Sequence, residues 1–349
     1  MTDFRLQLLL HITMGMKIEP NDLSRLREVD PYDVQAVLAA LTSIKARAYV
    51  AQRRDWREIS ERILQTSEAQ GIRWLSLYDD DYPCLWHELS ERPPVFSYQG
   101  EPCWLQRPLI SIVGSRTPAR ATLAWMQREL PEFLRCRPMG VVSGGARGVD
   151  QWAHRVAMDS GVPTICVFPT GLLNPYPFGN ETFWRRILDT GGCLMSTCGL
   201  REPLRKSFFH TRNRWITGLS RVCFVAEANR RSGSTMTARY AKDEHRDICT
   251  LPVFPLATQG LANLDLIEGG ATMLRDWRDL LIFVDRNYPN VLSPAPPQNT
   301  QREEQEDHVD QPQADGGGKQ SVLSSVVGAD VAHPVGDQQY EADHETATF

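Results

Sequence analysis

The chain of 349 residues is long enough for one large domain or two smaller ones. Hydrophobic residues make up 42% of it, which is ordinary for a chain that buries a core, and no apolar run approaches the roughly 20 residues that span a bilayer. The composition therefore argues against a membrane protein, and we expect a cytoplasmic one. The formal net charge of −5 argues against a nucleic-acid ligand unless the charges are segregated.

The charges are segregated along the chain. From Val291 onward there are eleven acidic residues and two basic ones, so the preceding residues carry a net charge of +4. A mildly basic body followed by an acidic segment is compatible with binding to nucleic acid but does not prove it.

The eight cysteines include no C-x-x-C pair. Cys166 and Cys223 fall inside apolar, strand-like runs, where a free thiol packs as a small hydrophobic group. This usage fits a reducing compartment and argues against a zinc ribbon or a disulfide scaffold. We expect neither a metal nor a cofactor.

The predicted elements divide the chain into three segments. Residues 1–70 show apolar residues at helical spacing and predict a small all-α domain. Residues 71–285 begin with a connector of strand character. From Pro108 short apolar runs alternate with stretches typical of helices, at 118–135, 150–160, 182–189, 213–219 and 234–244.

This alternation predicts an α/β domain with a mostly parallel sheet, covered by helices on both faces as in an extended Rossmann-like fold. Residues 286–349 are polar and acidic, and we expect them to form a disordered tail. In parallel sheets ligands bind where loops leave the carboxyl ends of the strands. The segments rich in Gly and Ser fall at those ends.

The first such loop is Gly114-Ser115-Arg116, between a predicted strand and a predicted helix. A glycine there lets a ligand approach the backbone, the following helix offers free N–H groups, and a guanidinium grips phosphate with two bonds. The loop is not the G-x-G-x-x-G pattern of dinucleotide sites. Equally, Gly114 could be only a tight turn and Arg116 only a surface charge.

The second loop, with Ser143, Gly144 and Arg147, again puts small residues before a helix. Asp150 could simply cap that helix, and His154 is more often a packed histidine than a catalytic base. The fourth loop, Ser232-Gly233-Ser234, resembles a phosphate-binding nest, but Ser234 could equally be an ordinary N-cap of the following helix.

The third segment, 206–214, interleaves basic and aromatic residues. Cations suit a phosphate backbone and a ring face stacks on a base, so this pattern favours single-stranded nucleic acid. Packing of Phe208 and Phe209 into the core, with the arginines in ion pairs, is the structural alternative. Together, four such segments at successive strand ends predict one extended anion-binding groove.

The chain resembles the DprA/Smf family of DNA-processing proteins over about residues 71–281. The resemblance rests on motifs that follow one another in the family's order. They are D-x-x-YP-x-L at 79–85, I-V-G-S-R at 112–116, S-G-x-A-x-G-V-D at 143–150, YP-x-x-N at 176–180, F-x-x-R-N-R at 209–214 and S-G-S-x-x-T-A at 232–238.

The resemblance implies a protein that is not an enzyme. Such a protein binds and protects incoming single-stranded DNA, forms a homodimer and loads the RecA recombinase in natural transformation. It also implies that Arg116 holds phosphates, Lys206 adds a cation and Phe209 faces a base. The DNA-binding residues expected on this basis are Gly114, Ser115, Arg116, Ser143, Gly144, Arg147, Lys206, Phe209, Arg212, Asn213, Arg214, Ser232, Gly233 and Ser234.

Two other functions compete with this one. Nucleoside-monophosphate phosphoribohydrolases have a related fold, but they carry a glutamate on a P-G-G-x-G-T-x-x-E loop. The corresponding loop here, 232–238, has none, and we interpret Glu227 as structural. A nucleotide-sensing module that uses the same loops is the third possibility.

Overall fold

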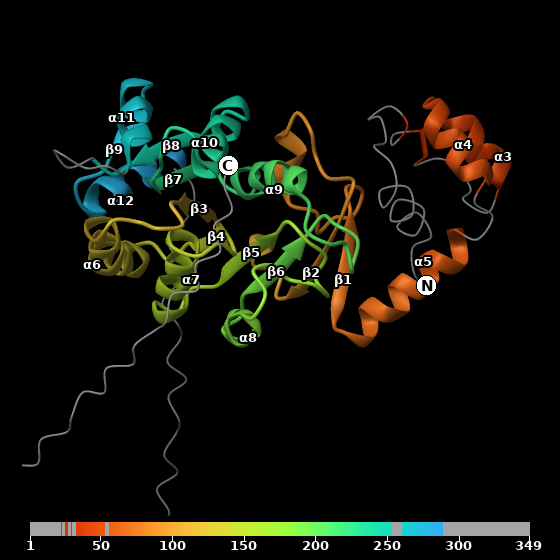
Figure 1. Cartoon of the computed structure of the whole chain (residues 1–349), viewed down its shortest axis with the longest axis horizontal. Coiled ribbons are helices and arrows are strands. Elements are labelled where there is room, and N and C mark those ends of the chain that lie inside the picture. The colour runs from red at the N-terminus through yellow and green to blue at the C-terminus, as the bar shows by residue number, and fades with distance from the viewer. Residues whose placement is uncertain are drawn as a thin grey trace, which may run out of the picture. The chain divides into compact units, whose positions relative to one another are not determined.

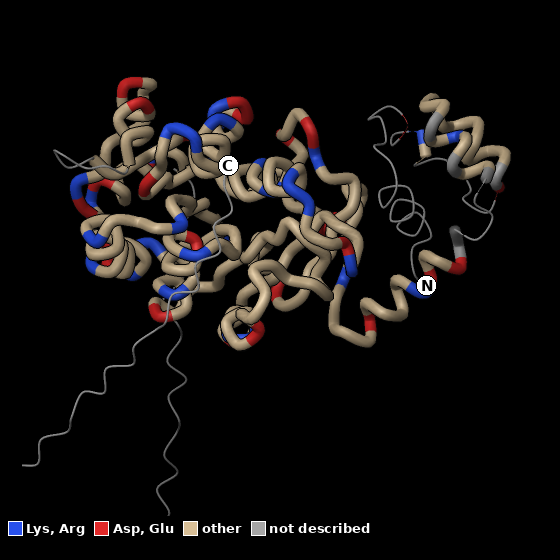
Figure 2. Tube along the Cα trace, in the orientation of Figure 1, with Lys and Arg blue, Asp and Glu red and all other residues tan. Residues whose placement is uncertain are grey.

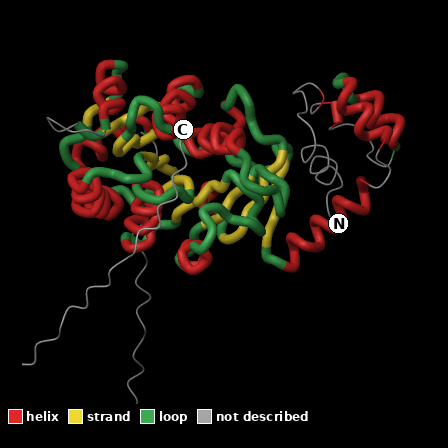
Figure 3. The backbone as a smooth tube through the Cα atoms, in the orientation of Figure 1, coloured by secondary structure: helices red, strands yellow, loops and turns green. Residues whose placement is uncertain are grey.

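The computed structural model of the chain describes residues 22, 25, 26, 29, 33–52, 56–252 and 260–288. These residues form a nine-stranded sheet with helices packed on both faces (Figures 1 and 3). The strands, in chain order, are β1 (Ile72–Ser76), β2 (Val95–Gly100), β3 (Leu109–Gly114), β4 (Gly140–Gly144), β5 (Thr164–Phe168), β6 (Cys193–Ser196), β7 (Val222–Glu227), β8 (Asp247–Thr250) and β9 (Thr272–Met273).

The spatial order of the strands is β1-β2-β6-β5-β4-β3-β7-β8-β9. Strand β2 is antiparallel to β1 and β6, and all other neighbours are parallel. The expected α/β fold with a mostly parallel sheet is therefore confirmed.

Two core clusters lie on opposite faces of the sheet. Strand β3 contributes Ile110 and Ile112 to one and Leu109 and Val113 to the other, because successive side chains of a strand alternate between its faces. The first face is covered by α6 (Arg120–Cys136), α7 (Val149–Asp159) and α12 (Trp277–Asn287), and the second by α9 (Lys206–Gly218), α10 (Gly233–Asp243) and α11 (Leu261–Glu268).

The remaining described helices are shorter or precede the sheet. Helix α8 (Glu181–Asp189) packs beside β6, and two 3₁₀ turns flank β2 (Cys84–Glu88 and Cys103–Leu105). The described part of the N-terminal segment is helical, as expected, with α3 (Val34–Ala40), α4 (Ile44–Gln52) and α5 (Trp56–Ala69). Asp33 caps α3, since its carboxylate accepts hydrogen bonds from the N–H groups of Gln35 and Ala36.

The direction of winding changes between β3 and β7. The strands that follow β3 are added on one side of it, and those that follow β7 are added on the other. Loops on either side of such a switch point diverge and leave a crevice at the carboxyl ends of the strands. In this chain the two loops are the one that follows Gly114 at the end of β3 and the one that follows Glu227 at the end of β7.

The prediction of a helix over 213–219 is wrong about where the helix begins. Helix α9 begins at Lys206, so the basic and aromatic segment 206–214 is helical. Phe209, Arg212, Asn213 and Ile216 follow the i, i+3, i+4, i+7 spacing of a buried helical face. Arg212 and Asn213 are polar, so a search for apolar residues at helical spacing does not detect this buried face.

The C-terminal boundary also differs from the predicted one. Helices α11 and α12 were not predicted, and α12 continues to Asn287, two residues past the expected end of the domain at 285. The predicted disordered tail from 289 onward lies outside the described residues.

The apolar environment expected for Cys166 and Cys223 is confirmed, because both side chains are fully buried. In the part of the chain that is described, no helix combines the length and apolar character needed to cross a membrane.

A buried hydroxyl fixes α9 to the central strand. Ser111 of β3 lies 2.6 Å from both the carbonyl oxygen of Ile216 and the hydroxyl of Ser220. Ser111→Ala should lower the free energy of unfolding by about 1–3 kcal/mol, because it removes two buried hydrogen bonds, each of which contributes about 0.5–1.5 kcal/mol. Urea unfolding would measure this loss, with Ser207→Ala, an exposed position on the same helix, as the control. Equal stability of the two variants would contradict the prediction.

Candidate nucleic-acid interface

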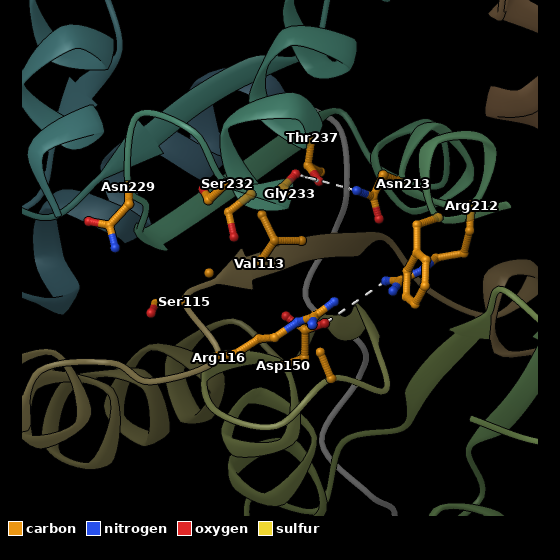
Figure 4. A pocket seen from close by; sticks show the side chains of 14 residues that line it. Val113, Ser115, Arg116, Asp150, Arg212, Asn213, Asn229, Ser232, Gly233 and Thr237 are labelled. Carbon is orange, nitrogen blue, oxygen red and sulfur yellow. Dashed lines mark hydrogen bonds and ion pairs between the residues drawn. The ribbon is translucent and has the colours of Figure 1, made fainter. Parts of the chain in front are cut away.

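A cavity of about 320 Å³ lies at the carboxyl ends of β3 and β7 (Figure 4). It occupies the crevice expected at the switch point, and its volume is at the lower end of the range for small-ligand sites. The residues that line it are Val113, Gly114, Ser115, Arg116, Ala146, Asp150, Phe209, Arg212, Asn213, Asn229, Ser232, Gly233, Ser234 and Thr237.

A second cavity of about 290 Å³ adjoins the first. The two share Arg116, Ala146, Phe209 and Arg212 as lining residues, and the second is completed by Thr117, Arg147, Tyr176 and Pro177. We call them the first and second cavities below.

Glycines let the β3 and β4 loops come close together. A Cβ on Gly114 would lie 2.5 Å from Val149, and one on Gly148, whose φ is +85°, would lie 2.3 Å from the carbonyl oxygen of Ser115. That oxygen accepts a hydrogen bond from the N–H of Val149, the first residue of α7. The Gly114-Ser115-Arg116 loop is therefore fastened to the N-terminus of α7.

The carboxylate of Asp150 links three elements beneath the first cavity. The backbone N–H groups of Ala146 and Gly114 lie close enough to stabilise its charged form. The guanidinium of Arg212, from α9, lies 3.9 Å away, and both side chains are 7% exposed (Figure 4). Gly144 makes room for this contact, since a Cβ there would lie 1.8 Å from Nη1 of Arg212.

Burial dominates the electrostatics of this pair. It raises the pKa of Asp150 to about 6, although Arg212 and the two backbone N–H groups act in the opposite direction. The same burial lowers the pKa of Arg212. A pair at 3.9 Å thus offsets only part of what both groups lose on leaving water.

Arg116 and Phe209 form the boundary between the two cavities. The guanidinium carbon atoms of Arg116 and Arg212 each lie 5.7 Å from the centroid of the Phe209 ring. Within the described residues, Arg116 makes no hydrogen bond and no ion pair, so its charge is directed to the cavities (Figure 4). Figure 2 shows basic positions on α9 and in the loop before α10 as well.

The loop between β7 and α10 forms the opposite wall. Ser232 is the N-cap of α10, and its hydroxyl accepts a hydrogen bond from the N–H of Thr235. The expected serine cap is thus present, at 232 and not at 234. The amide of Asn213 donates to the carbonyl oxygen of Gly233, which joins α9 to this loop.

The structure brings most of the predicted site residues together. Those that line a cavity are Gly114, Ser115, Arg116, Arg147, Phe209, Arg212, Asn213, Ser232, Gly233 and Ser234.

Four predicted residues line neither cavity. The hydroxyl of Ser143 is fully buried and donates to the carbonyl oxygen of Ile112, and Gly144 lies behind Arg212. Arg214 forms ion pairs with Glu91 and Glu244 and lies over the ring of Tyr240, so it connects α9 to its neighbours. Lys206 is exposed in the first turn of α9, outside both cavities.

The structural interpretations of His154 and Glu227 are confirmed. His154 is fully buried, its ring nitrogens lie near Thr164 Oγ1 and the Gly144 carbonyl oxygen, and burial lowers its pKa to about 4. Glu227 is buried and accepts hydrogen bonds from the N–H of Ala119 and the hydroxyl of Thr122, which tie it to the start of α6. Neither residue lines the first or the second cavity.

Several lining residues were missed by sequence reasoning. Asn229 and Thr237 flank the Ser232–Ser234 loop, and Tyr176 and Pro177 belong to the YP-x-x-N motif, which received no role. The position of Tyr176 beyond the strand end of β5 was the available signal. Across the described residues, no group of three or more His, Cys, Asp or Glu side chains is placed to hold a metal ion.

The fold and site define a Rossmann-like protein with an arginine-lined crevice at its switch point. The family model described as DNA recombination-mediator protein A matches residues 73–285, more than half of the chain. The chain therefore belongs to this family.

Known proteins agree with this assignment. Protein Smf of Synechocystis is 33% identical over 224 residues, which cover 63% of this chain and 56% of that protein. DNA processing protein DprA of Streptococcus pneumoniae is 33% identical over 216 residues, which cover 62% of this chain and 76% of that protein. The matched segment thus spans about half the length of the first relative and three quarters of the second.

Two solved structures share the fold. The structure of DprA from Streptococcus pneumoniae superposes with a TM-score of 0.63 and 28% identity, over 81% of this chain and 98% of that one. The structure of DNA processing protein A from Helicobacter pylori, which was solved to describe its single-stranded DNA binding mode, superposes with a TM-score of 0.55 and 26% identity. The superposition covers 62% of this chain and 97% of that one.

The raised pKa of Asp150 makes stability depend on pH. Its folded value of about 6 exceeds the ordinary 3.8, so its contribution is full below pH 3.8 and is lost as the pH rises through 6. Asp150→Asn cannot titrate. Between about pH 7.5 and 5 the wild-type chain should therefore gain stability relative to this variant, as measured by urea unfolding at each pH. The comparison cancels His154, whose lowered pKa acts in the opposite direction. A difference that does not change with pH would refute the assignment.

Proposed function

We propose that the chain binds single-stranded DNA in the two adjoining cavities. The observation that carries this proposal is the excess of cationic and N–H donors over acceptors there. Arg116 is unpaired among the described residues, and the Nε of Arg212 is buried without a hydrogen-bond partner. The start of α10 adds backbone N–H groups to the same wall. A phosphate is the ligand that would complete these groups.

The aromatic side chains favour a strand over an isolated phosphate. Phe209 separates the cavities, and Tyr176 meets it edge to face with centroids 5.9 Å apart. Rings beside phosphate-binding cations are the usual arrangement of single-strand sites, in which bases stack on aromatic faces. The single-stranded DNA binding of the Helicobacter pylori relative supports the same ligand class here.

The site fits glycoside-bond hydrolysis less well. Asp150 lines the first cavity and has a pKa of about 6, which is a feature of some catalytic acids. Its carboxylate, however, is already engaged by two backbone N–H groups and Arg212. Glu227, the other acidic residue near this loop, points to α6. We therefore propose a binding protein without a catalytic step, and expect no base release from a nucleoside monophosphate.

The test is fluorescence anisotropy with labelled oligothymidylate, at two salt concentrations and with a duplex of equal length as competitor. Salt-sensitive binding that prefers the single strand is the expected result, because phosphate contacts release counterions. Absence of binding at low salt would overturn the proposal.

Arg116→Ala should weaken binding and reduce the dependence of log affinity on log salt by about 0.7 for each phosphate that the variant no longer neutralises. Lys206→Ala tests whether the strand extends past the cavities to the start of α9, and we expect a smaller reduction of the same kind. The matched control is Arg286→Ala, an exposed arginine on α12 that lines neither cavity. If the Arg116 and Arg286 variants have the same salt slope as the wild-type chain, Arg116 does not contact phosphate.

The family membership supports a more specific role. We propose that the bound strand is protected and passed to a RecA-type recombinase, and that the protein acts as a homodimer. Faster recombinase filament formation on protein-coated single strands in the presence of the chain would support the first part, and sedimentation would measure the second.

A further inference from the structure

We propose that the segment Tyr176-Pro177-Phe178, together with Arg147, forms a second nucleotide subsite in which a base stacks on Phe178. This inference rests on the proposed binding of single-stranded DNA and extends it beyond the first cavity. It assigns a role to the YP-x-x-N motif.

Three aromatic rings form a row that leads out of the first cavity. Phe209 contacts Tyr176 edge to face, and Tyr176 contacts Phe178 in the same way, with centroids 5.9 and 5.6 Å apart. Phe178 ends the row and is 65% exposed. A single exposed phenylalanine is common on protein surfaces, but here it continues a row of rings that begins in a cationic site.

The rings of Phe209 and Phe178 differ in the cationic groups that already contact them. The guanidinium groups of Arg116 and Arg212 each lie 5.7 Å from the centroid of the Phe209 ring, so a base that stacks on this ring competes with them. Phe178 has no cation over its ring among the described residues. Its exposed surface is therefore the more accessible platform for a base.

The segment is held in place by the protein's own contacts. The side-chain amide of Asn180 lies 3.2 Å from the carbonyl oxygens of both Pro177 and Phe178. Gly145 allows the segment to pack closely, because a Cβ there would lie 3.2 Å from the carbonyl oxygen of Tyr176 and 2.9 Å from Trp184. A platform fixed in advance loses little conformational entropy on binding.

Arg147 supplies the charge for the backbone of the same nucleotide. It is exposed, lines the second cavity together with Tyr176 and Pro177, and makes no ion pair or hydrogen bond with any described residue. The two cavities share Arg116 and Phe209. A strand with one phosphate in the first cavity can therefore pass Arg116 and place its next nucleotide between Arg147 and Phe178.

The test compares Phe178→Leu, which keeps an apolar side chain but removes the ring, with Phe178→Trp, which keeps a stacking face. The control is Ile282→Ala, a residue of α12 that is 54% exposed and outside both cavities. On the shortest oligothymidylate that the wild-type chain binds fully, Phe178→Leu should weaken affinity by about fivefold or more without changing the salt slope. The Trp variant and the control should bind as the wild-type chain does.

A coupling measurement makes the assignment specific. Abasic sites are introduced one at a time along the same oligonucleotide. One position should cost the wild-type chain about fivefold or more and cost Phe178→Leu nothing further, since the base and the ring act as a pair. Arg147→Ala should instead reduce the salt slope by about 0.7.

Wild-type affinity in the Phe178→Leu and Arg147→Ala variants would overturn the subsite and leave the proposed function standing. If the wild-type chain itself binds no single strand, the proposed function fails, and the subsite fails with it. Absence of the pairwise coupling alone would also overturn the assignment of Phe178 as the stacking ring.

Discussion

The buried carboxylate of Asp150 is the constraint on which the site depends. The N–H groups of Gly114, at the end of β3, and of Ala146, in the loop after β4, stabilise its charged form, and the guanidinium of Arg212 from α9 lies 3.9 Å away. Without a carboxylate there, two backbone donors and a guanidinium would face one another in a volume from which water is largely excluded. The glycine at 144 follows from the same requirement, because a side chain would occupy the place of Arg212.

This arrangement explains why the crevice is cationic although an acid is among its lining residues. Two backbone donors and one guanidinium share the carboxylate, and burial opposes its ionisation. Arg116 then adds a charge that makes no hydrogen bond or ion pair with a described residue, although it acts on Asp150 electrostatically. In the proposed function, a bound phosphate would supply the acceptor that the buried Nε of Arg212 lacks, which would offset part of the energetic cost of burying this side chain.

The sequence predicted the framework more reliably than the details of the site. The parallel sheet and its helices followed from apolar runs, whose periodicity reports burial directly. Helix α9 was predicted too short because its buried face includes Arg212 and Asn213, which a hydrophobic pattern counts as exposed.

Ser143 looked like a ligand group from its position at a strand end, but its hydroxyl faces the sheet and bonds to Ile112. Whether a residue at a strand end points to the ligand depends on the pleat and on tertiary packing, neither of which a local motif specifies. Tyr176 was overlooked for the converse reason. Its ring reaches the second cavity only because Gly145, in another loop, lets the segment approach.

The chemistry of the lining groups indicates a ligand recognised by its backbone and not by its sequence. Arginines and helix N–H groups contact phosphates, and rings accept any base because every base has a π face. The groups best suited to read base edges are the amides of Asn213 and Asn229. The first donates to the carbonyl oxygen of Gly233, and the second accepts from the N–H of Gly260. Side chains that already hold loops together have less capacity to discriminate bases, and the proposed binding of single strands of any sequence would require no such discrimination.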